Sequence, residues 1–367
     1  MAVSAIAMHR FLGISDQEAQ ARIVAAKRAL GDRVLILGHH YQREEVFQHA
    51  DIFGDSLKLS REAAQSSAEY IIFCGVHFMA EVADIMSRPD QISILPDLSA
   101  GCSMADMASL AKVQRAWREL DEMLGGVEDR VTPVTYINSA ADLKAFCGAH
   151  NGIVCTSSNA QRVLNWAFEQ GEKVLFFPDQ HLGRNTAHKM GISLQEMVVW
   201  DFDLPNGGLT AEQVQKAKMI LWKGFCSVHQ MFKPEHIDSF LQKYPETKVI
   251  SHPEASFEVC QKSDYVGSTD YIINTISEAA PNTRWLVGTE LNLVNRLANQ
   301  FKGEGKNIHF MSPTICMCST MFRISPQHLA WTLEGLMEDK VVNQIKVPEK
   351  EAMLAKLALE RMFAVSA

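Results

Sequence analysis

The 367-residue sequence lacks the marks of membrane, nucleotide-binding and nucleic-acid-binding proteins. It has no run of about 18 apolar residues, so we expect no membrane-spanning helix. Neither the GxGxxG pattern nor the Walker A pattern occurs, which leaves no sign of dinucleotide or ATP binding. Acidic residues outnumber basic ones, 43 to 35, so the formal charge of -8 argues against a nucleic-acid partner. A small anionic substrate remains compatible with local positive groups.

Compact cysteine motifs are also missing. No CxxC…CxxC pair indicates a zinc site, and the eight cysteines are too dispersed for a small disulfide framework. The apolar stretch at 1–11 is too short for a secretory signal, so we expect a cytoplasmic protein with reduced thiols. The cysteines are then free thiols, metal ligands or catalytic groups, and they lie at positions 74, 102, 147, 155, 226, 260, 316 and 318.

Strands and helices are predicted to alternate in three loosely similar copies. The first strands of the copies lie at 34–37, 131–136 and 248–250, and a polar loop at 38–54 follows the first. This alternation is typical of an α/β fold with parallel sheets and right-handed crossovers. A polar excursion at 178–223 interrupts the second copy. We predict α/β repeats at 1–125, 126–235 and 236–345, and a helical tail at 346–367.

Each copy ends with a cysteine after its last strand. Because ligands of open α/β sheets bind beyond the carboxyl ends of the strands, Cys102, Cys226 and one of Cys316 or Cys318 could meet there. Three thiolates would leave one position of a zinc ion or an iron–sulfur cluster open to substrate. The plainer interpretation is a buried thiol, which suits the cysteines within predicted strands and helices, namely Cys74, Cys147, Cys155 and Cys260.

Polar side chains follow the first strand of every copy. His39 and Tyr41 follow one, Tyr136 and Asn138 another, and His252 and Glu254 the third; they are either acid–base groups or loop-capping residues. Small hydroxyl residues also begin one helix per copy. They are either ordinary N-caps or ligands of a substrate with several anionic groups, and they are Ser56, Ser157, Ser268 and Thr269.

Eleven short motifs, taken in order over 34–324, resemble the quinolinate synthase family, the NadA enzymes of bacterial NAD biosynthesis. Some are short, but their common order is specific. They are GHHYQ (38–42), GDS (54–56), GCSMA (101–105), YINS (136–139), CTSSNA (155–160), PDQHLGRN (178–185), CSVH (226–229), HPE (252–254), GST (267–269), GTE (288–290) and CSTM (318–321).

The resemblance implies three similar βαβαβ domains around a pseudo-threefold axis, with the active site at their common interface. It also implies one [4Fe–4S] cluster, held by Cys102, Cys226 and Cys318. Cys318 is preferred to Cys316 because Met321 follows it with the family spacing. The implied reaction condenses iminoaspartate with dihydroxyacetone phosphate, losing phosphate and two waters, to give quinolinate. An aspartate oxidase is the implied transient supplier of iminoaspartate.

The resemblance also assigns site residues by position. Tyr41 and Glu254 are our candidates for moving protons, while His39 and His252 polarise or orient the substrate. The remaining matched groups are expected to bind substrate, and they are Ser56, Tyr136, Asn138, Ser157, Ser268 and Thr269. Cys260 and Cys316 are expected to be structural thiols.

Two other interpretations stay open. Three thiolates do not choose their metal, so a zinc-dependent hydrolase or lyase using His39, His252 and cysteine ligands is the alternative enzyme. An iron–sulfur sensor that binds a small anion without converting it is the alternative from another class.

Overall fold

The computed structural model describes residues 7–315 and 317–366, which form two compact units. The first unit contains 7–102 and 317–347, and the second contains 103–315 and 348–366. Among the helices of these described residues, none is long and apolar enough to cross a membrane.

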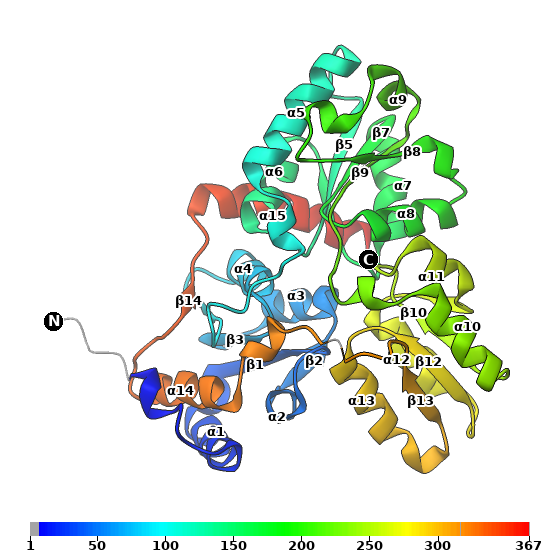
Figure 1. Ribbon diagram of the computed structural model, residues 1–367. Helices are drawn as coiled ribbons and strands as arrows, with labels where there is room; N and C mark the ends of the chain where they lie inside the picture. The colour runs from blue at the N-terminus through cyan, green and yellow to red at the C-terminus, as the bar shows by residue number, and fades with distance from the viewer. Residues whose placement is uncertain (1–6, 316, 367) are drawn as a thin grey trace. The chain divides into compact units, whose positions relative to one another are not determined.

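The first unit is built on one five-stranded sheet, in the order β14-β4-β3-β1-β2. All its pairings are parallel except the edge pairing of β14 with β4. Helix α1 contacts α14, and α3 contacts α4. Figure 1 shows these two pairs on opposite sides of the sheet. The elements are α1 (Asp16–Leu30), β1 (Val34–His39), α2 (Glu44–Phe47), β2 (Ile52–Gly54), α3 (Ser56–Gln65), β3 (Tyr70–Cys74), α4 (His77–Met86), β4 (Ile92–Ile94), α14 (Pro326–Met337) and β14 (Gln344–Ile345).

The second unit contains two sheets, the first in the order β6-β5-β7-β9-β8. The C-terminal helix packs on α6, drawn in red beside teal in Figure 1. This contact depends on Gly148, where a Cβ atom would lie 1.9 Å from the carbonyl oxygen of Leu354. The elements are α5 (Leu110–Leu124), β5 (Val131–Tyr136), α6 (Ala141–Ala149), β6 (Ile153–Cys155), α7 (Ala160–Gln170), β7 (Lys173–Phe177), α8 (Gln180–Lys189), β8 (Met197–Trp200), α9 (Ala211–Lys216), β9 (Met219–Trp222) and α15 (Glu349–Val365).

The other sheet of the second unit has four parallel strands, in the order β11-β10-β12-β13. A core that includes Phe232, Val249 and Leu286 lies against it. Short three-residue 3-10 turns connect several elements throughout the fold. The elements are α10 (Pro234–Lys243), β10 (Lys248–Ser251), α11 (Phe257–Lys262), β11 (Tyr265–Val266), α12 (Thr269–Glu278), β12 (Arg284–Gly288), α13 (Leu291–Gln300) and β13 (Asn307–Phe310).

The three sheets share one topology. Their parallel cores run β2-β1-β3-β4, β6-β5-β7-β9 and β11-β10-β12-β13, so the first strand of each copy lies between the second and the third. Central strands such as β3 and β7 are buried along their whole length, as expected where both faces of a parallel sheet are covered. The predicted α/β class with three similar parallel sheets is confirmed. The predicted boundaries at 125, 235 and 345 stay predictions.

Two stretches differ from the sequence prediction. Residues 178–223 are not a polar excursion, because they contain α8, β8, α9 and β9. The four residues of β9 are all buried, but so short an apolar run carries little periodic signal. The expected loop at 38–54 contains α2 and the three-residue strand β2, which pairs with β1.

Candidate active site

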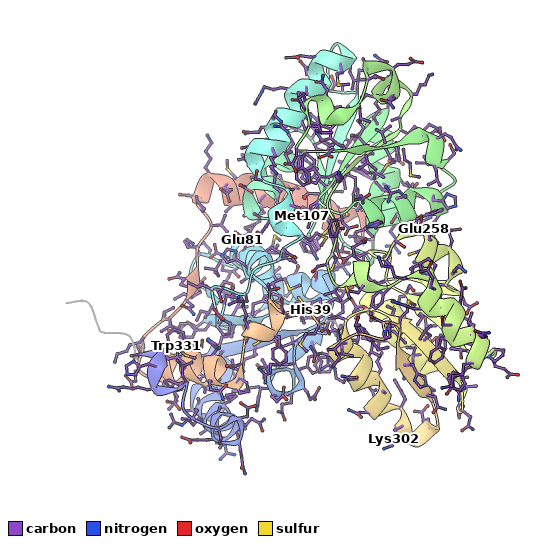
Figure 2. The ribbon with its side chains drawn as sticks, in the orientation of Figure 1. His39, Glu81, Met107, Glu258, Lys302 and Trp331 are labelled. Atoms are coloured by element: carbon purple, nitrogen blue, oxygen red, sulfur yellow. The ribbon has the colours of Figure 1, made fainter. Side chains whose placement is uncertain are left out.

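Polar side chains gather where strands of the second unit end. Tyr136 is the last residue of β5, and Asp179 follows β7. Cys226 and His229 follow β9, and Glu254 lies just beyond β10. Figure 2 labels Glu258, which lies on α11, and Lys302, which lies in the turn between α13 and β13. The carboxyl ends of parallel strands are the usual location of ligand sites in α/β folds.

Glu254 is the centre of a buried hydrogen-bonded group. The hydroxyl of Tyr136 donates to Glu254 Oε1 at 2.6 Å, and His229 Nδ1 lies 3.0 Å from Glu254 Oε2. The His252 ring stacks on the His229 ring, with centroids 4.8 Å apart. All four residues are buried. The structure therefore brings together three predicted site residues, Tyr136, His252 and Glu254, and adds His229.

The electrostatics of this group favour a carboxylate beside a neutral imidazole. Burial lowers the pKa of His252 to about 3, so its ring is neutral at neutral pH. Burial alone would raise the pKa of Glu254, but the neighbouring imidazoles and the Tyr136 hydroxyl lower it below its ordinary value. Since His252 is neutral at neutral pH, the contacts with Tyr136 and His229 are what keep Glu254 ionised there.

The loop that carries Cys226 is anchored to the end of β7. The carboxylate of Asp179 accepts hydrogen bonds from the backbone N–H groups of Leu182 and Cys226, the first at 2.7 Å. The backbones of Asp179 and Gly224 form a parallel bridge. Met107, labelled in Figure 2, accepts a hydrogen bond from Trp222 Nε1 through its carbonyl oxygen at 3.0 Å. The position of Cys226 is therefore set by tertiary contacts of this segment with Asp179 and Met107.

Asn185 holds the loop that carries His252 and Glu254. From α8, its side-chain amide donates to the carbonyl oxygens of Pro253 and Ala255, at 2.8 and 2.9 Å. The amide nitrogen also lies 3.2 Å from Cys260 Sγ, which is buried under the same loop. Asn185 thus joins the second and third sheets directly at the site.

The predicted hydroxyl ligands Ser157 and Ser268 line one pocket of the second unit. Its volume is about 190 Å³, and Lys189 supplies a positive charge at its wall. Ser268 also caps α12 by accepting from the N–H of Tyr271, so the plainer interpretation as an N-cap holds for it too. Thr269 is buried at the start of the same helix. In the same unit, Asn138 Oδ1 is buried without a hydrogen-bond partner among the described residues, as a substrate-binding atom would be.

The first unit contains the remaining predicted groups. His39 ends β1, and its ring meets the ring of Tyr41 edge-on, with centroids 4.8 Å apart. Ser56 is the first residue of α3, whose N-cap is Asp55. Cys102 lies in the loop beyond β4, and Cys318 Sγ lies 3.4 Å from the hydroxyl of Thr320.

The described cysteines fall into two classes. Burial raises the pKa of the thiols of Cys74 and Cys260 to about 12, and it also raises the pKa of the Cys147 and Cys155 thiols. Such thiols are poor ligands, since metals bind the thiolate. The other class is partly exposed and contains the three predicted ligands, Cys102, Cys226 and Cys318. Cys316 lies outside the described residues.

Sequence reasoning assigned no role to three residues that the structure places in this region: Asp179, Asn185 and His229. Each lies in a motif that supported the family resemblance, Asp179 and Asn185 in PDQHLGRN and His229 in CSVH. Motif membership was therefore the available signal. Their contacts, however, are with residues up to 75 positions away in the chain, which no local pattern predicts.

Comparison with known proteins gives one consistent result. A family described as "Quinolinate synthetase A protein" matches residues 21–364. A quinolinate synthase of Streptomyces coelicolor is 56% identical over 353 residues, covering 96% of this chain and 89% of the relative. Those of Acidobacterium capsulatum and Rhodopirellula baltica are each 53% identical, covering 98% and 97% of this chain and 96% and 93% of the relatives. By the extent of these matches, the chain belongs to the quinolinate synthase family.

Proposed function

We propose that this protein catalyses the quinolinate synthase reaction. Iminoaspartate condenses with dihydroxyacetone phosphate, and phosphate and two waters leave as the pyridine ring of quinolinate closes. These products account for all atoms of the two substrates, so the reaction needs no oxidant or reductant. It consists of carbon–carbon and carbon–nitrogen bond formation, proton transfers and eliminations. The observation that supports it most directly is the buried group of Tyr136, His229, His252 and Glu254 beside Cys226.

A [4Fe–4S] cluster fits the donor set. Among the described cysteines, Cys102, Cys226 and Cys318 are the ones that are partly exposed, while the others are buried with raised pKa values. We propose these three as the ligands. A cluster bound through these three cysteines would leave one iron open and would supply a Lewis acid for the eliminations.

Glu254 is suited to accept a proton. Its carboxylate is held ionised at neutral pH, and Oε1 is oriented by the Tyr136 hydroxyl. His252 is neutral, so its ring can orient a substrate hydroxyl or carbonyl as donor or acceptor. Tyr41 is the proposed second proton carrier, with His39 beside it in the first unit.

The substrates carry carboxylates and a phosphate, and the proposed contacts match them. Ser157 and Ser268 provide hydroxyls in a pocket lined also by Lys189, and Asn138 has an unused amide oxygen. Ser56 and Thr269 supply hydroxyls at the starts of α3 and α12. A helix N-terminus supplies N–H groups to an anion as well.

The cellular setting follows from the chemistry. Cluster ligands must remain reduced thiols, so we propose a reducing compartment, the cytoplasm. The product would enter de novo NAD biosynthesis. An aspartate oxidase that releases iminoaspartate is the proposed transient partner, because that substrate is unstable in water.

An anaerobic assay of the reconstituted protein tests the function. Brown protein that forms quinolinate from the two substrates is the expected result. Colourless but active protein would contradict the cluster, and coloured protein that binds substrate without forming quinolinate would support a sensor instead.

Tyr41→Phe and Glu254→Gln are expected to lower kcat at least tenfold, and near-normal turnover in both would remove them from the mechanism.

A further inference from the structure

Three metal-ligating side chains of different kinds converge in the second unit. The Sγ atom of Cys226, a ring nitrogen of His229 and a carboxylate oxygen of Glu254 all lie within 4.8 Å of one another. His229 and Glu254 are buried, and Cys226 is partly exposed. We propose that the chain without its cluster binds one divalent transition-metal ion, best fitted by zinc, through Cys226, His229 and Glu254.

The chemistry of the three donors suits zinc. A thiolate, an imidazole and a carboxylate are all common zinc ligands, and three protein ligands with an open fourth position are typical of sites that bind water or substrate. Tetrahedral zinc, with bonds of about 2.0–2.3 Å, needs its ligand atoms about 3.3–3.7 Å apart. His229 Nδ1 and Glu254 Oε2 already lie 3.0 Å apart, and none of the three ligand atoms is more than 4.8 Å from another. Two anionic donors also offset the charge of the ion.

The surrounding residues orient these ligands. The Tyr136 hydroxyl occupies Glu254 Oε1, which leaves Oε2 on the side of His229. The His252 ring stacks on the His229 ring and restricts its rotation. The Asp179 carboxylate accepts from the backbone N–H of Cys226. Such outer contacts commonly change metal affinity by about 10- to 100-fold.

The ion and the proposed cluster would compete. Both need the Cys226 thiolate, and the ion would also occupy Glu254, our proposed proton acceptor. This competition rests on the proposed function, whereas binding of the ion does not. Zinc would therefore hold the cluster-free chain in an inactive state until it is removed.

Cobalt(II) titration of the cluster-free, reduced full-length chain tests the site. We expect one equivalent to produce a thiolate-to-cobalt charge-transfer band with tetrahedral ligand-field bands, and zinc to displace it. Cys226→Ser should abolish the charge-transfer band, and His229→Ala and Glu254→Gln should each weaken binding at least tenfold. His236→Ala, on the partly exposed start of α10, is the matched control and should bind normally.

The decisive controls are Cys102→Ser and Cys318→Ser. Both should bind cobalt like the unmodified chain, because their thiols are not part of the Cys226, His229 and Glu254 site. Loss of the band in either variant would overturn the proposal in favour of a site made of cysteines.

X-ray absorption of the zinc-loaded unmodified chain identifies the ligand atoms without relying on the folding of variants. One sulfur and two or three nitrogen or oxygen neighbours are expected, and three sulfurs would contradict the site.

A second experiment separates the competition from the site itself. The zinc-loaded chain is mixed anaerobically with iron and sulfide, with and without prior chelation. We expect little visible cluster absorbance until zinc is removed. Normal cluster assembly in the presence of bound zinc would refute the competition. The proposed function is tested separately, by quinolinate formation in the chain that has been chelated and reconstituted.

Discussion

The hydroxyl of Tyr136 donates a hydrogen bond of 2.6 Å to Glu254 Oε1 and joins residues 118 positions apart. Tyr136 ends β5 and Glu254 follows β10, so this bond connects two sheets of the second unit. It fixes the orientation of the carboxylate and helps to keep it ionised, although it is buried. The two copies of the repeat therefore share one acid–base group.

Removing that hydroxyl tests its importance. Tyr136→Phe keeps the ring but leaves Glu254 with one donor fewer, so we expect kcat/KM for quinolinate formation to fall by about 10- to 100-fold, as for other displaced catalytic groups. Tyr244→Phe is the matched control. The ring of Tyr244 contacts Phe240, His309 and Arg284, none of which belongs to the proposed site. Equal activity of the two variants would mean that the bond does not matter for catalysis.

The close approach of Gly224 to the end of β7 should be necessary for cluster binding. A Cβ atom at Gly224 would lie 2.3 Å from the carbonyl oxygen of Pro178, so Gly224→Ala must displace the segment that leads to Cys226. We expect less iron and sulfide per chain after reconstitution, measured by chemical analysis. Gly303→Ala is the control, since no atom lies within 4 Å of the added Cβ. A full cluster content in both variants would show that the anchor can give way.

Asn185 should stabilise the fold as well as the site. Asn185→Ala removes the amide donor that the carbonyl oxygens of Pro253 and Ala255 share. We expect the free energy of unfolding to fall by about 2–3 kcal/mol, the usual effect of leaving buried polar groups unsatisfied. Urea denaturation measures this, with Asn307→Ala as the control because its bond to Gly305 is exposed. A loss no larger than that of the control would contradict the role of Asn185.

His181 predicts a pH dependence of stability. Burial, with the nearby charge of Arg184, lowers the pKa of His181 from 6.5 to about 4. Below pH 6.5 the His181 ring is therefore protonated in the unfolded chain, whereas in the folded chain it stays neutral until the pH falls to about 4. The contribution of the neutral His181 ring to the free energy of unfolding is fully present above pH 6.5 and declines as the pH falls. The decline amounts to about 2 kcal/mol between pH 7 and pH 5.

The measurement is urea unfolding of the cluster-free chain at several pH values. His181→Gln should flatten the dependence by that amount, while His9→Gln, at an exposed position, should leave it as it is in the unmodified chain. A steeper or unchanged slope in His181→Gln would be inconsistent with a buried neutral ring.

The order of elements was predictable because it depends on local patterns. Buried strands such as β5 and β7 were located to the residue, since continuous apolar runs bounded by polar loops indicate them clearly. Helix α1 was equally clear, because Ser15 accepts from the N–H of Glu18 and Gly31 ends the helix with a positive φ of 54°. The strands β2, β8 and β9 were missed, because they are short and their pairing with neighbouring strands is a tertiary contact that no local pattern shows.

By itself, the sequence determined the α/β class, the three copies and the residue types available for chemistry. The alternation of strands and helices and the order of the motifs depend only on local sequence. Tertiary structure alone decided which of those residues meet. Tyr136 and Glu254 are bonded, His229 joins them, and Asn185 and Asp179 hold the loops in place, although no local pattern relates these positions. Such contacts arise because parallel strands bring distant loops to the same edge of a sheet.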